Sequence, residues 1–225
     1  MAQHSILGFI HLQKTAGITV TWIMRSSFGS HHLDLPPARH FLDPVLTARE
    51  LQHWGRSYGD LRSFRGHRVV PYTDVDVAYP QVRFFTLLRD PVKRMASWFQ
   101  YQVQQKRSGR RSDVTPGNVL DEFEVWIQQD FRHNWQTRRI AGRVDVDAAI
   151  EMIRDKEIFV GLVEHFDESM LLLKGLVSSE LNIGYSRRNV AVASTIAKTL
   201  LESERARQLL AEANDADLQL YEYVK

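Results

Sequence analysis

The sequence predicts an α/β fold in which a central, mostly parallel sheet lies between layers of helices. Short runs rich in Val, Ile, Leu and Phe alternate with longer segments of helical periodicity. The apolar runs do not alternate cleanly with polar residues, which is typical of parallel strands buried on both faces. The expected strands are Ile6–Leu12, about Ser63–Val70, Val82–Leu88 and Ile158–Val163.

Helices are expected between and after these strands. Pro91 suits a first helical turn, because its ring fixes φ and its missing N–H is not needed there. Asn118 is placed to cap a helix whose apolar residues recur every four positions, and Asp215 is placed to open a last short helix. The expected helices are Ile18–Ser27, Pro91–Gln105, one that carries Val119, Phe123, Ile127 and Phe131, Asp147–Asp155, Ser194–Ala213 and a short one from Asp215.

Length, charge and composition exclude several classes of protein. With 225 residues the chain can bury one substantial core, so we expect one domain over residues 1–225. The formal net charge of +2 argues against a nucleic-acid-binding protein and requires any anion site to come from local clustering. The absence of cysteine excludes disulfides, thiol nucleophiles and Cys-ligated metals. No stretch approaches 18 apolar residues, so no membrane span is expected.

The first expected strand runs directly into a turn and a helix through the sequence HLQKTAGIT, residues His11–Thr19. Such a junction directs backbone N–H groups and the positive helix end to one point. Lys14 adds a charge, Gly17 lets a ligand approach the backbone, and Thr15 and Thr19 add hydroxyl donors. The segment is not a Walker A loop, because its glycine follows the lysine. It predicts a cradle for phosphate or sulfate, and an ordinary turn with a solvated lysine is the alternative.

A second junction follows the third expected strand in the sequence RFFTLLRDPVKRMASWF. Arg89 stands at the carboxyl end of that strand, where parallel sheets bind ligands, and its guanidinium can hold a phosphate through two bonds. Asp90 is expected to cap the next helix or to pair with Arg89, and Ser97 lies two turns further on. The alternative is an Asp-Pro helix start with incidental arginines.

Together the two motifs resemble those of sulfotransferases that use 3′-phosphoadenosine 5′-phosphosulfate (PAPS). HLQKTAGIT resembles their 5′-phosphosulfate loop, although Ile18 stands where Thr is common, and FTLLRDPVKRMASWF resembles their 3′-phosphate motif. The resemblance is to the carbohydrate branch that includes heparan sulfate and uronyl 2-O-sulfotransferases. Asn134–Arg138 (NWQTR) and Phe159–Glu164 (FVGLVE) also resemble segments of that group, so the resemblance spans Ile6 to about Glu168.

The resemblance implies a P-loop-like three-layer fold and an enzyme that moves a sulfuryl group from PAPS to a hydroxyl, releasing 3′-phosphoadenosine 5′-phosphate (PAP). Lys14 would be catalytic, by stabilising charge on the leaving phosphate. Arg188 would lie in a late loop over the nucleotide, with a solvated basic turn as the alternative. No metal is expected, since no cluster of His, Asp and Glu has ligand spacing. The residues implied to bind the donor are Lys14, Thr15, Ala16, Gly17, Ile18 and Thr19 at its 5′ end, and Arg89 and Ser97 at its 3′-phosphate.

His67 is the expected catalytic base, because it stands in a Gly-His element that resembles the one carrying a catalytic histidine in the 2-O-sulfotransferase branch. Histidine suits proton transfer near neutral pH. That branch often has a second histidine two positions earlier, where this sequence has Arg65. Either His67 works alone or Arg65 binds an anionic acceptor. His11 is the alternative base, although we expect it to pack or to orient the loop.

The acceptor is expected to be a sugar or a glycan. Segment Lys106–Gly117 is expected to be an exposed loop whose Arg110 and Arg111 attract a polyanion or are simply solvated. The chain is short for the eukaryotic Golgi enzymes of the branch, so a bacterial cytoplasmic enzyme is expected, with a truncated luminal domain as the alternative. The oligomeric state stays open. A P-loop kinase that uses ATP and a non-catalytic nucleotide- or glycan-binding relative are the competing functions.

Overall fold

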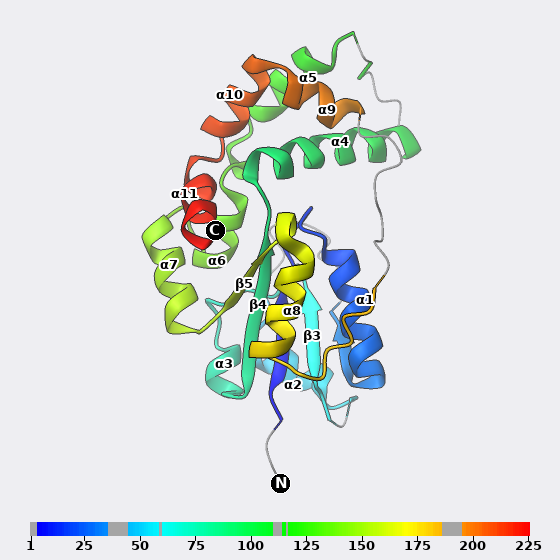
Figure 1. Cartoon of the computed structure of the whole chain (residues 1–225), viewed down its shortest axis with the longest axis vertical. Helices are drawn as coiled ribbons and strands as arrows, with labels where there is room; N and C mark the ends of the chain where they lie inside the picture. Colours follow the sequence, from blue (N-terminus) through cyan, green and yellow to red (C-terminus); the bar gives the residue numbers. More distant parts are fainter. Residues whose placement is uncertain (1–3, 36–44, 59, 110–113, 116, 186–194) are drawn as a thin grey trace.

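The computed structural model describes residues 4–35, 45–58, 60–109 (106–109 by their backbone), 114–115, 117–185 and 195–225. Within them, five strands form one sheet in the order β2-β3-β1-β4-β5, and every neighbouring pair is parallel. The α/β class with a central parallel sheet is therefore confirmed (Figure 1). The strands are β1 (Ile6–Ile10), β2 (His32–Asp34), β3 (Ser63–Gly66), β4 (Val82–Leu88) and β5 (Phe159–Leu162).

Four of the five strands lie where the sequence predicts them, but three are shorter than predicted. β1 and β3 end at Ile10 and Gly66, because the chain turns there into the loops at the carboxyl edge of the sheet. Strand β2 was missed. It has only three residues, His-Leu-Asp, and pairs with β3 alone, so it lacks the length and the β-branched residues that mark a strand in a sequence.

Strand β1 shows why the sheet needs cover on both faces. Ile6 and Ile10 pack into one hydrophobic cluster, and Leu7 and Phe9 pack into another on the opposite face. This is the period of two that a pleated strand imposes. All five residues of the strand are buried, as expected for the centre of a parallel sheet.

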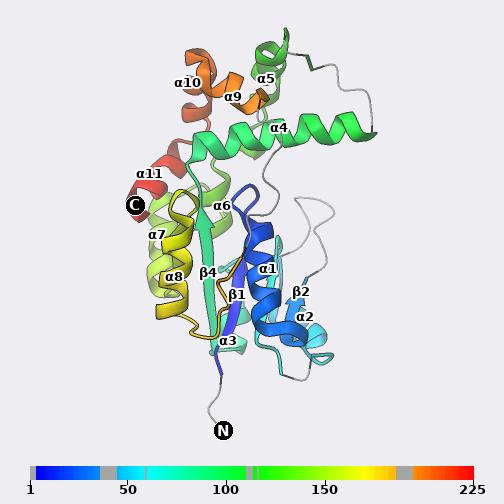
Figure 2. The same cartoon turned by 45° about the vertical axis from the view of Figure 1, so that its right-hand side comes forward.

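Helices cover each face of the sheet. α1 (Gly17–Phe28) and α8 (Phe166–Leu176) pack on the face that carries Phe9. Figure 2 shows α1 beside β1 and α8 beside β4. The opposite face, which carries Ile10, is covered by five helices. The five are α2 (Ala48–Gly55), α3 (Val75–Ala78), α6 (Trp135–Ala141), α7 (Val146–Asp155) and α11 (Asp215–Val224).

A third group of helices lies beyond the carboxyl ends of the strands, at the top of Figure 1. These are α4 (Pro91–Gly109), α5 (Val119–Ile127), α9 (Thr195–Glu202) and α10 (Glu204–Glu212). They share a separate core in which Phe99, Phe123, Leu200 and Leu210 are at most 2% exposed. Three short 3-10 turns complete the described elements: η1 (Gly29–His31), η2 (Asp130–Arg132) and η3 (Val163–His165).

Two expectations about this helical group were wrong. Helix α4 continues to Gly109, so the first part of segment Lys106–Gly117 is helical and not a loop. The expected helix Ser194–Ala213 is interrupted at Ser203, whose hydroxyl accepts a hydrogen bond from the N–H of Ala206 at 3.3 Å. A serine in this position starts a new helix, because it satisfies one of the N–H groups that a first turn leaves unpaired.

The helix after Asn118 also differs in detail. It ends at Ile127, and Phe131 lies in η2 instead of on the same helix. The Asn118 side chain makes no capping bond to the helix; its oxygen accepts from the N–H and the hydroxyl of Thr115, at 2.6 and 3.0 Å. Among the helices of the described segments, none combines the length and apolar character that crossing a bilayer requires.

Candidate functional site

The turn between β1 and α1 has an unusual backbone. Lys14 and Ala16 have φ values of 68° and 60°, a region that residues with a Cβ rarely occupy. The hydroxyl of buried Thr15 donates to the carbonyl of Leu12 at 2.9 Å and braces the turn. In the described segments, no backbone carbonyl accepts from the N–H groups of residues 14–18. The turn therefore presents a row of N–H groups at the start of a helix, an arrangement that binds anions.

Gly17 is the point where the turn meets His11. A Cβ built on Gly17 would lie 1.7 Å from Nε2 of His11, so the ring packs directly on the glycine backbone. The expectation that His11 packs against the loop agrees with this contact. The glycine is needed because the imidazole occupies the space of any side chain.

Replacing Gly17 with alanine is expected to lower the free energy of unfolding by about 1–3 kcal/mol, the usual cost of overpacking. Urea unfolding measures this change. Gly175→Ala in α8 is the control: a Cβ there has no neighbour within 4 Å, so stability should hold or rise. In a His11→Ala background the Gly17→Ala change should become mild. An equal loss in both backgrounds would show that the His11 ring does not set the requirement.

The register of the sheet brings two histidines together. Ile10 of β1 pairs with Gly66 of β3, so the residues that follow them, His11 and His67, lie side by side. Their rings stack, with centroids 4.1 Å apart and an interplanar angle of 24°. The two candidate bases therefore form one pair, next to the turn that contains Lys14.

Arg65 fixes the orientation of His11. Its Nη1 donates to Nδ1 of His11 at 3.2 Å, so the hydrogen of the neutral His11 ring is on Nε2. Its Nε forms an ion pair with the carboxylate of Asp34 in β2. Both contacts of the Arg65 guanidinium are thus made with groups of the protein itself. The expected contact between Arg65 and an anionic acceptor stays a prediction. Burial, followed by the charges of His67 and Arg65, holds the pKa of His11 well below its ordinary value.

His67 is held in the tautomer that a base needs. Its Nδ1 donates to the carbonyl of His11 at 2.9 Å, which leaves the lone pair on Nε2. Burial lowers the pKa of His67, the charges of Arg65 and Arg139 lower it further, and the hydrogen bond to the His11 carbonyl opposes them. The ring is therefore neutral at pH 7 and able to accept a proton.

Arg89 joins the two sequence motifs. Phe9 of β1 pairs with Phe85 of β4 in a parallel register, so the residues that follow both strands lie at the same edge of the sheet. Nη1 of Arg89 donates to the carbonyl of Lys14 at 3.1 Å. The pKa of Lys14 is lowered by burial and then by the Arg89 charge. Two positive side chains held this close favour a bound anion, because an anion would offset their repulsion.

The ammonium group of Lys14 also faces helix α4. It lies 4.7 Å from the ring centroid of Tyr101, which stacks on Trp98 with centroids 5.5 Å apart. Ser97, the residue before Trp98, is half-buried on the same helix. The helix that begins just after Arg89 therefore forms one side of the cradle.

The remaining predicted residues divide into two groups. Ile18 is 44% exposed and Thr19 is buried, both in the first turn of α1. Arg110, Arg111 and Arg188 lie outside the described residues. Across the described ranges, no group of three or more His, Cys, Asp or Glu side chains is arranged to hold a metal ion.

One solved structure resembles the fold of this chain over nearly the whole length of both chains. The crystal structure of a sulfotransferase from Alicyclobacillus acidocaldarius matches with a TM-score of 0.52, covering 98% of this chain and 96% of that one, at 13% identity. The chain has the sulfotransferase fold.

Sequence comparison finds relatives that are also named as sulfotransferases. Galactose-3-O-sulfotransferase 3 of mouse is 27% identical over 248 residues, covering 96% of this chain and 55% of the relative. Its human counterpart is 27% identical over 224 residues, covering 86% of this chain and 49% of the relative. The chain thus spans about half the length of these relatives, and no protein-family model matches it. The predicted resemblance to carbohydrate sulfotransferases is confirmed, with relatives named for 3-O rather than 2-O transfer.

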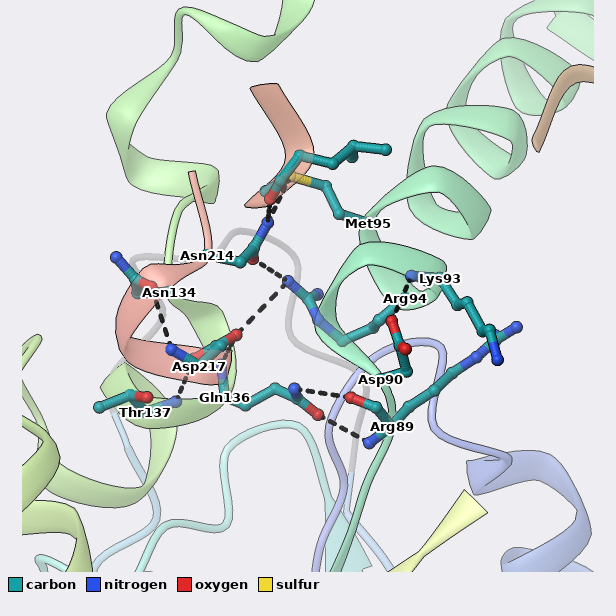
Figure 3. A network of polar contacts seen from close by, with 11 residues as sticks. Arg89, Asp90, Lys93, Arg94, Met95, Asn134, Gln136, Thr137, Asn214 and Asp217 are labelled. Carbon is teal, nitrogen blue, oxygen red and sulfur yellow. Dashed lines mark hydrogen bonds and ion pairs between the residues drawn. The ribbon is translucent and has the colours of Figure 1, made fainter. Parts of the chain in front are cut away.

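In the sulfotransferase fold of this chain, the end of β4 is held by Glu164 and Gln136, to which no individual role was assigned from the sequence. Glu164, at the end of the FVGLVE segment, accepts from the N–H of Asp90 at 3.2 Å and from the hydroxyl of Tyr221 at 3.0 Å. Asp90 in turn accepts from the N–H of Lys93 at 2.9 Å, so its expected capping of α4 is confirmed. Gln136 of the NWQTR segment binds the backbone of Arg89 (Figure 3). The only signal for these residues was the resemblance of their segments to the family.

Proposed function

We propose that this protein transfers the sulfuryl group of PAPS to a hydroxyl group of a carbohydrate and releases PAP. The hydrogen bond from Arg89 to the Lys14 carbonyl carries the proposal, because it joins two anion-binding elements into one site. PAPS has an anionic 5′-phosphosulfate and an anionic 3′-phosphate, and one cationic element is present for each.

The donor would bind across these two elements. The N–H groups of residues 14–18 and the Lys14 ammonium group would hold the 5′-phosphosulfate. Gly17 would leave the backbone open at the start of α1. Arg89 and Ser97 would bind the 3′-phosphate, Arg89 through its guanidinium fork.

His67 would start the transfer step. Its Nε2 takes the proton of the acceptor hydroxyl while that oxygen attacks the sulfur atom, and the bond from sulfur to the bridging oxygen breaks. The bridging oxygen and its electron pair stay on the phosphate of PAP, and the proton stays on His67. Lys14 and the N–H groups stabilise the charge that develops on this phosphate. Binding both reactants in line supplies the rest of the rate enhancement.

The acceptor we propose is a galactose-containing glycan. Support comes from the relatives, which are named for 3-O-sulfation of galactose. Tyr101 also favours a sugar, because it is 38% exposed beside Lys14 and its side chain combines an apolar ring with a hydroxyl group.

Thermal unfolding with PAP, with ADP, and with ATP plus Mg²⁺ tests the donor assignment. PAP at 100 times its dissociation constant should add about 2.7 kcal/mol, and this should raise the midpoint temperature by roughly 5–10 °C. ADP, which lacks the 3′-phosphate, should have a much smaller effect at the same concentration. If ATP with Mg²⁺ stabilises the protein and PAP does no better than ADP, the donor is not PAPS and a kinase becomes the better interpretation.

A further inference from the structure

One glutamine side chain holds the backbone of Arg89. Gln136 lies in the first turn of α6 and is fully buried, at 0% exposure. Its Oε1 accepts from the N–H of Arg89 and its Nε2 donates to the carbonyl of Arg89, both at 3.0 Å (Figure 3). The two polar groups of the Arg89 backbone are thus bound by a single amide, just past the last residue of β4.

This contact fixes the residue that connects the two anion-binding elements. Because the backbone of Arg89 is held on one side by Gln136, its side chain extends from a fixed point to the carbonyl of Lys14. A shift of the Arg89 backbone would move the guanidinium away from both the Lys14 turn and the proposed 3′-phosphate position.

Gln136 is itself held by the last helix of the chain. Asp217 of α11 is fully buried, and its carboxylate accepts from the N–H of Gln136 at 3.0 Å and from the N–H of Thr137 at 2.7 Å. Asn134 is in a left-handed conformation with φ of 47° and makes no side-chain cap on α6. Asp217 therefore caps this helix from 80 residues away, and Asn134 Oδ1 accepts from the N–H of Asp217 in return, at 3.1 Å.

A buried arginine completes the network. Arg94 of α4 is 2% exposed, and its Nη2 lies 3.9 Å from the Asp217 carboxylate and 3.4 Å from Oδ1 of Asn214. Burial lowers the pKa of Arg94, but an arginine remains charged in proteins. The charge of Asp217 is thus balanced by that of Arg94 inside the protein. Through Asp217, helix α11 is bound both to α4 and to α6, which carries Gln136.

We propose that Gln136 is a positioning residue for the 3′-phosphate, acting through the backbone of Arg89, and that Asp217 on α11 holds Gln136 in place. The inference rests on the proposed function, because it assigns Arg89 to the 3′-phosphate of the donor. The ability to distinguish PAP from nucleotides without a 3′-phosphate then depends on a side chain that does not touch the ligand.

The test compares binding of PAP and of adenosine 5′-monophosphate to Gln136→Met by isothermal titration calorimetry. Methionine has nearly the same length but cannot bind either backbone group of Arg89. PAP binding should weaken roughly tenfold, as expected when the position of a charged contact is lost, while binding of the monophosphate should change by less than about twofold. A role confined to stability would lower the unfolding temperature and leave the ratio of the two affinities unchanged.

Gln219→Met is the matched control, since Gln219 is exposed on α11 and should alter neither affinity. If Gln136→Met does not fold, Gln136→Glu replaces it: this variant keeps an acceptor for the Arg89 N–H and loses the donor to its carbonyl. It should show the same selective loss for PAP. A wild-type protein that binds both nucleotides equally would overturn the proposed function. A wild-type preference for PAP that the Gln136 variants retain would overturn the positioning role alone.

Discussion

Replacing Lys14 with alanine is expected to lower the turnover number by about 10²- to 10³-fold, the usual effect of removing one preorganised donor from a developing negative charge. The ammonium group lies over the Tyr101 ring, beside the turn. Burial, and then the charge of Arg89, lower the pKa of this group. Turnover with PAPS and a galactose-terminated oligosaccharide is the measurement. The backbone N–H groups and Arg89 are unchanged in this variant, so PAP should still bind.

The fold of the Lys14→Ala variant should be intact. Lysine and alanine carry the same Cβ at a positive φ, so the backbone strain of the turn is similar in both proteins. Lys198→Ala, on the exposed surface of α9, is the control and should turn over at the wild-type rate. A Lys14→Ala protein with turnover within about twofold of wild type would rule out a catalytic role for this lysine.

Replacing His67 with asparagine is expected to lower the turnover number by about 10²- to 10⁴-fold, the usual contribution of a general base. Asparagine retains an N–H donor for the His11 carbonyl, which His67 Nδ1 contacts at 2.9 Å, but it cannot accept the acceptor's proton. His53→Asn on α2 is the control, because His53 is exposed. Donor binding, measured with PAP, should be little changed.

The pH dependence of turnover identifies the base independently. A base acts in its deprotonated form, so the wild-type rate should fall as pH decreases through the pKa of His67, which burial places below the ordinary value of 6.5. This acid limb should be absent from the residual rate of His67→Asn. If the limb persists in that variant and disappears in His11→Asn, the base is His11, and the roles of the two stacked rings are reversed.

Much of the site could be predicted because its signals are local. The change from a buried apolar run to Lys14, Gly17 and a helix marks a strand–turn–helix junction within about ten residues. The same holds for Arg89 between β4 and Pro91. Parallel strands place such junctions at one edge of the sheet, so both were expected at the edge where parallel sheets bind ligands.

The other features depend on contacts between distant segments, which no local pattern encodes. The order β2-β3-β1-β4-β5 places Asp34 beside Arg65, and this pairing engages the arginine that the sequence assigned to the acceptor. The missed strand β2 has too few residues to produce a periodic signal, so Asp34 could not be predicted as the partner of Arg65. Local sequence therefore predicted the charge of Arg65 but not what it binds.

The sequence by itself determined the class of fold and indicated two candidate anion-binding elements, because strand burial, helix starts and loop composition are properties of short segments. It indicated His67 as a candidate base through the resemblance of its Gly-His element to the 2-O-sulfotransferase branch. The tertiary structure alone decided which nitrogen of His67 is free, since that depends on the carbonyl of His11 across two paired strands. It also decided what holds Arg89, since Gln136 is 47 residues away from it and Asp217 a further 81. Such contacts form only when packing brings buried polar groups together and each must find a partner.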